Sequence, residues 1–356
     1  MRVLLEGLAT HGIDVVECNV PLGFSTAERV EMLRKPWRLS LLLTRLARNW
    51  LQLVVLSTRM RRRSRPDAVL VGYLGHFDVF LARFLFPHTR IVLDHLIFAG
   101  DTAKDRGSGG GWRGRVLNAL DRAAIAQAAI IVCDTQEHAG LVPVNHRSRA
   151  VVVPVGADGS WFRAGDPATR TITAADDSAG QLSVIFFGLM TPLQGAPVLA
   201  AALRELDGAV RATVVGSGQD SAEVDLILRG VPGVERSEWV DPAQLPELVA
   251  SHDLCLGIFG KSPKAQHVVP NKVYQGAAAG CLILTSDTPP QRRALHDSAV
   301  LVPPGDSVAL ARALRELADD PARVARLREV ARRTVRDEFS PHAVTSSLAR
   351  RLEGRL

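Results

Sequence analysis

The chain has 356 residues, of which 47% are hydrophobic and 22% charged, and it carries a formal net charge of +6. This composition excludes a disordered or fibrous protein, and the length favours two domains over a single core. The arginines cluster with little aromatic interleaving, which indicates solvated helix faces and excludes a nucleic-acid partner from our expectations.

The start of the chain does not fit the usual strand and helix. Residues 8–12 are too few to connect a first strand to a parallel strand beginning at Ile13, because such a crossover needs about a dozen residues. We therefore predict a helix over residues 2–11, closed by Gly12, and a strand over residues 13–20. The first strand of the domain would then be missing, and we expect roughly 15–25 further residues before Arg2 in the working protein.

A second helix is predicted over residues 37–65, with apolar residues on one flank and arginines near its end. The flank comprises Leu39, Leu42, Leu43, Leu46, Leu53 and Leu56, with Trp50 nearby, and the basic residues are Arg59, Arg61, Arg62 and Arg63. Two interpretations stay open: burial against the domain's own sheet, or contact with an anionic membrane surface.

Short runs rich in Val and Ile alternate with longer amphipathic stretches along the rest of the chain. The runs are AVLVGY, RIVLD, IIVCD, AVVVPV, LSVIFFG, RATVVG, DLCLGIF, CLILTS and AVLV. This alternation predicts an α/β fold with parallel sheets covered by helices. Residues 163–180 are polar, contain Gly and Pro, and lack periodicity, so we expect a linker there between domains spanning residues 1–162 and 181–340. Residues 341–356 are expected to form a helix that packs back on the first domain.

The four cysteines, Cys18, Cys133, Cys255 and Cys281, show no CxxC or metal-ligand spacing, so we expect them to be reduced. The chain shows no signal-peptide pattern and no charge-free run of 18 apolar residues. We expect a cytoplasmic location, with peripheral contact to the inner face of the membrane as an open alternative.

Three motifs in the second half of the chain suggest a nucleotide site. In FFGLMTPLQG (residues 186–195) a strand ends in a glycine turn and a helix begins near Gly195, which would present free N–H groups to a phosphate. In VVGSGQD (residues 214–220) the two glycines would let the backbone approach a nucleotide. Ser221 stands where a dinucleotide fingerprint has its third glycine, which argues against an oxidoreductase.

The third motif, PKAQHVVPNKVYQGAAAGCLILTSD (residues 263–287), predicts a helix that starts near Asn271. The charge of Lys272 would add to the positive end of the helix dipole, where a phosphate binds favourably. A lysine that is merely solvated on the surface is the alternative interpretation.

On these three motifs, residues 182–340 resemble family-4 (group 1) glycosyltransferases of the GT-B fold, and within them a subgroup associated with bacterial glycan or lipid-linked sugar assembly. The resemblance implies two Rossmann-like domains that face each other across a cleft, with the first domain on the acceptor side. It implies a retaining glycosyltransferase that moves a sugar from a nucleotide-sugar to a glycan, lipid-linked or small-molecule acceptor. No cofactor is implied, and because the chain has no D-x-D pair we expect no metal.

The resemblance also implies individual site residues. The donor-binding residues are Gly188, Gln194, Gly195, Gly216, Gly218, Lys264, His267, Asn271, Lys272 and Gln275. Relatives often carry basic residues where this chain has Leu189 and Gln194, so Lys272, with Lys264 or Lys261, would supply the missing charge. His267 and Gln275 occupy the places of an E-x7-E pair.

In the first domain, Asp94 and His95 follow the run RIVLD, where similar enzymes place a catalytic side chain beside the transferred sugar. The acceptor-side residues are His76, Asp101, Asp105 and Arg106, and the motif CDTQEH (residues 133–138) follows another predicted strand. A buried polar pair at Asp94 and His95, and a plain surface loop around Asp101, are the alternatives.

Other functions remain open on the sequence. A nucleotide-sugar 2-epimerase of the same architecture could use His95 and Gln275, and it would need no acceptor. A non-catalytic nucleotide-sugar-binding partner subunit would explain the replaced motif residues, and it would bind without turnover. The absence of a G-x-S-x-G elbow argues against a serine hydrolase.

Overall fold

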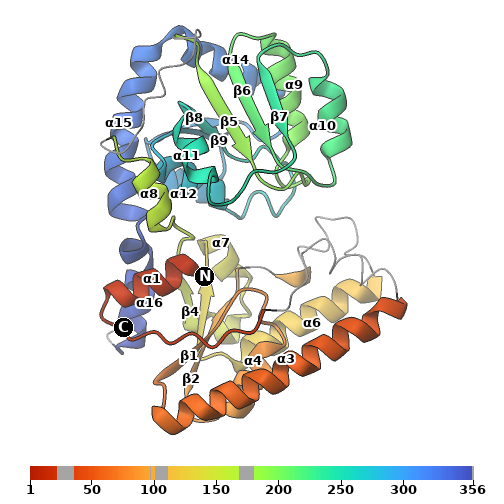
Figure 1. Ribbon diagram of the computed structural model, residues 1–356, viewed down its shortest axis with the longest axis vertical. Coiled ribbons are helices and arrows are strands. Elements are labelled where there is room, and N and C mark those ends of the chain that lie inside the picture. Colours follow the sequence, from red (N-terminus) through yellow and green to blue (C-terminus); the bar gives the residue numbers. More distant parts are fainter. Residues whose placement is uncertain (22–35, 97, 101–110, 168–179, 355–356) are drawn as a thin grey trace.

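In the computed structural model the chain forms two α/β domains stacked along its long axis (Figure 1). The structure describes residues 1–21, 36–96, 98–100, 111–167 and 180–354. Both domains contain parallel sheets covered by helices, so the predicted fold class is confirmed.

The first domain is built on a four-stranded parallel sheet in the order β1-β2-β3-β4. Its elements are α1 (Arg2–Thr10), α3 (Pro36–Arg63), β1 (Ala68–Val71), α4 (Asp78–Leu85), β2 (Arg90–Asp94), α6 (Gly111–Gln127), β3 (Ile130–Cys133), α7 (Gln136–Leu141), a 3-10 helix (Val144–Arg149) and β4 (Ala150–Val152). The next helix, α8 (Gly159–Ala164), packs on the second domain, where Trp161 is buried (Figure 1). Ile91 and Leu93 of β2 face the core beneath α4 and α6, whereas Val92 faces α1 and α16.

The second domain is built on a six-stranded parallel sheet in the order β10-β9-β8-β5-β6-β7. Its elements are β5 (Ser183–Phe187), α9 (Ala196–Leu206), β6 (Arg211–Val215), α10 (Ser221–Leu228), β7 (Val234–Ser237), α11 (Leu245–Ala250), β8 (Leu254–Leu256), α12 (Asn271–Ala278), β9 (Leu282–Ser286), α13 (Pro289–Leu295), β10 (Ala299–Val302), α14 (Ser307–Asp319), α15 (Pro321–Glu338) and α16 (Pro341–Leu352). The strand order reverses between β5 and β8, and open α/β sheets bind ligands at the carboxyl ends of the strands at such a switch point.

The last helix returns to the first domain. α16 packs against α1 and β4, and Leu348 is buried in the core of the first domain (Figure 1). α1 crosses α16 at Gly7, where a Cβ would lie 2.2 Å from the carbonyl oxygen of Pro341. This glycine therefore allows the two helix backbones to approach closely.

The start of the chain agrees with the sequence analysis in one element and differs in the next. The predicted first helix is present as α1, and Gly12 has a φ of 77°, as expected of a closing glycine. The strand predicted over residues 13–20 is wrong, because these residues pair with no strand of the sheet. Ile13 and Val15 nevertheless pack, half-buried, on the core. Apolar residues thus keep their burial without the backbone pairing that defines a strand.

The helix predicted over residues 37–65 is present as α3, at the outer edge of the first domain next to α4 (Figure 1). Trp50 is half-buried, and its indole N–H donates to Asp78 Oδ1 at 2.8 Å. Leu46 and Leu53 are half-buried, and the side chains of Leu39, Leu42 and Leu43 lie outside the described residues. Within the parts of the chain that are described, no helix combines the length and apolar composition needed to cross a bilayer.

Candidate active site

Lys272 is the most unusual of the predicted donor-binding residues. It lies in the first turn of α12, it is buried, and its Nζ has no hydrogen-bond partner among the described residues. The Nζ lies 3.5 Å from the centroid of the Phe186 ring and close to Gly188, where a Cβ would be 3.6 Å from it. Burial lowers the pKa of Lys272 to about 7. The interpretation as a solvated lysine is therefore wrong.

Gly216 and Gly218 shape the turn that adjoins this position. They have positive φ angles of 130° and 159°, and a Cβ on Gly216 would lie 1.9 Å from the carbonyl oxygen of Gly188. The turns after β5 and β6 are joined by backbone hydrogen bonds, such as Met190 N–H to Ser217 O at 3.0 Å. In this structure the glycines of VVGSGQD are thus required for close packing of two turns at the edge of the sheet.

The remaining predicted donor-binding residues lie around the same end of the sheet. Gly195, with a φ of 64°, precedes α9, and Gln194 Oε1 is buried without a partner among the described residues. Lys261 is exposed with its side chain over Gly305, and Lys264 is half-buried. Lys272 is thus the lysine that the structure places beside Gly188.

A pocket of about 170 Å³ lies between the two domains. It is lined by Asp94 from the end of β2, by Val153 and Pro154 after β4, and by Asn271 and Gln275 of α12. The structure therefore brings one predicted catalytic residue together with two predicted donor-binding residues. Ligand pockets usually measure about 300–1,000 Å³, so this pocket accommodates only part of a nucleotide-sugar.

Asp94 is buried in the wall of this pocket, and neither carboxylate oxygen has a partner among the described residues. Burial raises the pKa of Asp94 to about 6, and the positive N-terminal amine of Met1 opposes that rise. A buried carboxylate without hydrogen bonds is costly unless a ligand uses it, so Asp94 is the first-domain residue best placed to contact a substrate.

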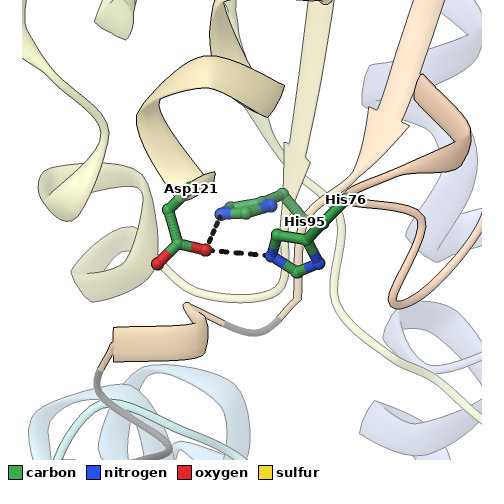
Figure 2. Close-up of side chains that lie close together, drawn as sticks. All are labelled: His76, His95 and Asp121. Atoms are coloured by element: carbon green, nitrogen blue, oxygen red, sulfur yellow. Dashed lines mark hydrogen bonds and ion pairs between the residues drawn. The ribbon is translucent and has the colours of Figure 1, made fainter. Parts of the chain in front are cut away.

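His95 does not line the pocket with Asp94. Its side chain points to the side chains of His76 and Asp121, from the turn after β1 and from α6 (Figure 2). His76 Nε2 lies 2.9 Å from Asp121 Oδ1, and His95 Nε2 lies 3.8 Å from the same oxygen. Burial and, to a smaller extent, the nearby His76 lower the pKa of His95 to about 4. The predicted catalytic His95 and acceptor-side His76 thus lie in a buried polar cluster behind the pocket wall.

Burial also raises the pKa of Asp121, but hydrogen bonds from His76 and from the backbone N–H groups of Ala99 and Gly100 outweigh it and hold that pKa below its ordinary range. Among the described residues, His76, His95 and Asp121 form the one group whose possible ligand atoms lie within 4.8 Å of one another. Asp121 was missed in the sequence, because a lone aspartate within a helical stretch carries no local signal.

The helix α7 of the first domain, together with the residue before it, contacts the second domain. Thr135 Oγ1 donates to the carbonyl oxygen of His267 at 2.7 Å, and Glu137 pairs with Arg293. The ring of His138 lies 6.5 Å from the ring of His267, and His138 Nδ1 is bonded to Asp134. His267 thus contacts the first domain. The motif CDTQEH (residues 133–138) was noted in the sequence. Its contact with the second domain could not be predicted there, because His267 and Arg293 lie more than 100 residues away along the chain.

Three predicted acceptor-side residues, Asp101, Asp105 and Arg106, lie outside the described residues. A wider surface hollow of about 410 Å³ lies on α3, and all its lining residues come from that one helix, including Leu51 and Val55. It is therefore an open face of α3 and not an enclosed site.

Comparison with solved structures identifies the architecture. HepE from Anabaena in complex with UDP and glucose has a TM-score of 0.64 at 15% identity, covering 85% of this chain and 81% of that chain. Sucrose-phosphate synthase from Thermosynechococcus elongatus has a TM-score of 0.66 at 14% identity, covering 87% and 79%. A glycosyltransferase from Rickettsia africae has a TM-score of 0.60 at 14% identity, covering 85% and 81%. The chain has the GT-B fold.

The family model described as glycosyl transferase-like matches residues 196–350. The resemblance to group 1 glycosyltransferases is thereby confirmed for most of the second domain of this GT-B chain. No curated protein matches the chain in sequence. In the GT-B fold found here, the pocket with Asp94, Asn271 and Gln275 lies where the two domains meet.

Proposed function

We propose that the chain is a retaining glycosyltransferase that transfers a sugar from a nucleoside-diphosphate sugar without a divalent metal on the diphosphate. The similarity to GT-B structures, one of them named as a complex with UDP-glucose, supports a nucleotide-sugar donor. The observation that carries the proposal is the unpaired, buried amine of Lys272 at the switch point between β5 and β8.

In this proposal Lys272 binds the diphosphate together with the first turn of α12 and the turn at Gly188. An anion beside the amine would remove the cost of leaving a buried donor unpaired, and the helix dipole would add to the attraction. Gln275 lies one helical turn further along α12, where its amide can bind a hydroxyl of the nucleotide-sugar. Lysine and helix N–H groups then perform the charge neutralisation that other transferases obtain from a metal.

Asp94 is assigned to the reacting sugar. Its carboxylate stands across the pocket from α12, so a sugar attached to a diphosphate at Lys272 would meet it on the first-domain side. There the carboxylate would stabilise positive charge on an oxocarbenium-like sugar or orient the acceptor hydroxyl. His95 and His76 are not assigned to substrate contact, because their side chains point into the cluster with Asp121.

We assign the acceptor to glycans or lipid-linked sugars presented at an anionic membrane surface, with α3 as the contacting face. Leu51, Val55 and Leu56 expose 68%, 49% and 37% of their area on this helix. Arg48 and Arg59 flank them on the same face. Exposed apolar side chains between arginines match the chemistry of an anionic lipid surface.

The deciding experiment screens nucleoside-diphosphate sugars for thermal stabilisation and then incubates each stabilising donor with and without candidate acceptors. A ligand that binds only the folded state raises the melting temperature. We expect stabilisation by a donor and a glycosylated product only when acceptor is present, with the anomeric configuration of the donor kept in the product. Conversion of the donor without acceptor would favour the 2-epimerase, and stabilisation without any turnover would favour a nucleotide-sugar-binding partner subunit.

A further inference from the structure

His76, His95 and Asp121 converge from three separate elements of the first domain (Figure 2). Their side chains are 9%, 1% and 5% exposed, so the cluster lies inside the domain. Two of the separations between possible ligand atoms are 2.9 Å and 3.8 Å, and none exceeds 4.8 Å. The Nε2 of His95 is buried and has no hydrogen-bond partner among the described residues.

The surroundings hold these three side chains in place. Backbone N–H groups of Ala99 and Gly100 donate to the two oxygens of Asp121 at 3.1 Å and 3.2 Å. The Phe98 ring stands edge-on to the His95 ring, with the centroids 4.6 Å apart. The backbone N–H of His95 donates to Val132 O at 2.9 Å, which ties it to β3. Hydrogen bonds to a ligating carboxylate, like those to Asp121, are a feature of metal sites.

The charge of the cluster is not balanced by the described part of the chain. There, the carboxylate of Asp121 is paired with imidazole and backbone N–H groups, and with neither lysine nor arginine. A buried carboxylate beside an unpartnered imidazole nitrogen is costly, and a bound cation would relieve both costs.

We propose that His76, His95 and Asp121 bind a zinc ion. Zinc takes imidazole nitrogen at about 2.0–2.1 Å and carboxylate oxygen at about 2.0–2.2 Å, so ligand atoms of a tetrahedral site lie about 3.3 Å apart. The separations of 2.9 Å and 3.8 Å bracket this value, and small side-chain movements would close the site. For zinc to bind at Nε2, the imidazole proton of His76 must lie on Nδ1, so that Nε2 and the Asp121 carboxylate both offer lone pairs to the metal.

The zinc site is separate from the diphosphate position. It lies within the first domain, behind the wall that carries Asp94, whereas Lys272 belongs to the second domain. Because Asp94 and His95 are consecutive, an ion on His95 would fix the end of β2 and thereby the position of the Asp94 carboxylate. The proposal stands independently of the glycosyltransferase assignment.

The test uses the full chain without a histidine tag. Metal content is measured by mass spectrometry, bound metal is removed with a chelator, and Zn²⁺ is then titrated by calorimetry while the melting temperature is recorded. We expect one zinc per chain and a rise in melting temperature with Zn²⁺. His95→Gln should weaken zinc binding by more than about 10-fold, the lower limit found when even the groups around metal ligands are lost.

Two variants separate metal binding from hydrogen bonding. His76→Gln keeps an N–H donor toward Asp121, so a hydrogen-bonded cluster would tolerate it whereas a zinc site would not. His252→Gln changes a buried histidine of the second domain that contacts Thr213 and Leu248, and it should bind zinc like the unaltered chain. Cobalt(II) added to the unaltered chain should give the visible spectrum of a four-coordinate site, a readout that needs no variant.

Two results would overturn the proposal. One is zinc binding of equal strength in the unaltered chain and in His76→Gln, and the other is the absence of stoichiometric zinc in the unaltered chain.

Discussion

The two domains of this chain differ in how their buried polar groups are arranged. In the second domain the six-stranded sheet carries at its switch point the buried amine of Lys272, which has no hydrogen-bond partner among the described residues. In the first domain, strand β2 of the four-stranded sheet ends at Asp94, which faces the pocket. The next residue, His95, faces the buried cluster with His76 and Asp121. The second domain thus offers a positive group to an anion, and the first offers a carboxylate to a neutral or positively charged centre. In the proposed function this difference divides the work between the domains: the second binds the diphosphate, and the first contacts the reacting sugar or the acceptor.

The largest expected effect comes from the first-domain side of the pocket. Asp94→Asn should reduce turnover by about 100-fold or more, since a positioned carboxylate contributes roughly 10²–10⁴-fold. Binding of the nucleoside diphosphate, measured by calorimetry, should stay unchanged because Lys272 is untouched. Asp241→Asn, an exposed carboxylate of the second domain, is the control with unchanged turnover. Equal loss of turnover and donor binding in Asp94→Asn would contradict the division between domains.

On the second-domain side, Lys272→Met should weaken nucleoside diphosphate by about 1.5–3 kcal/mol and leave nucleoside binding almost unchanged, because only the charged contact is lost. Titration of both ligands measures this difference. Lys261→Met, which removes an exposed lysine nearby, should change neither affinity. A similar loss for nucleoside and nucleoside diphosphate in Lys272→Met would show that the amine does not contact phosphate.

The buried amine of Lys272 should also make the stability of the chain depend on pH. The pKa of Lys272 is lowered to about 7 in the folded chain, while in the unfolded chain it returns toward 10.5. Between these values the unfolded state holds more protons, so stability rises with pH, at most by about 1.4 kcal/mol per pH unit. Cys255 is the other titratable group whose charge acts on this amine, and burial keeps its pKa well above the ordinary value.

This dependence is measured by urea unfolding of the unaltered chain and of Lys272→Met at several pH values above 7. The free energy of unfolding of the unaltered chain should rise relative to that of the variant as pH increases. A constant difference between the two proteins would mean that Lys272 keeps its ordinary pKa. Nucleoside diphosphate should show the opposite trend and bind less tightly as the amine loses its proton.

A smaller effect is expected at the edge of the first domain. Reversing Arg48 and Arg59 to glutamate should weaken flotation with anionic vesicles by about 1 kcal/mol for each arginine near the surface. The free energy of unfolding should change by no more than about 0.5 kcal/mol, because both side chains are exposed. Flotation that is insensitive to salt and to these substitutions would remove α3 as the membrane-contacting face.

Added divalent metal ions are expected to have no effect on turnover. Turnover of dialysed enzyme should be the same with and without added Mg²⁺ or Mn²⁺, because the amine and helix N–H groups neutralise the diphosphate. An enzyme that loses turnover on dialysis and regains it specifically with Mg²⁺ or Mn²⁺ would contradict the metal-free diphosphate site. Zinc in the first domain is measured separately by metal content, so the two results do not interfere.

The sequence by itself determined the α/β class, the helical start closed by Gly12, and most strands, because apolar runs of this length and alternation have few other ways to be buried. It also located Lys272 at the start of a helix. It did not predict β7, whose residues VERS carry charged side chains on an edge strand, and it wrongly predicted a strand over residues 13–20. An apolar pattern specifies burial, but a strand also needs a neighbour with which to pair.

Only the tertiary structure decided what the candidate site residues contact. Asp94 and His95 are adjacent in sequence, yet one lines the pocket and the other turns into the domain, because neighbouring side chains at a strand end point in opposite directions. Asp121 contacts His76 across 45 residues of sequence, and Lys272 of α12 contacts the ring of Phe186 of β5; no local spacing encodes either contact. Burial then shifted the pKa values of Asp94, His95 and Lys272 toward the neutral forms, because loss of water follows from the packing of the whole chain.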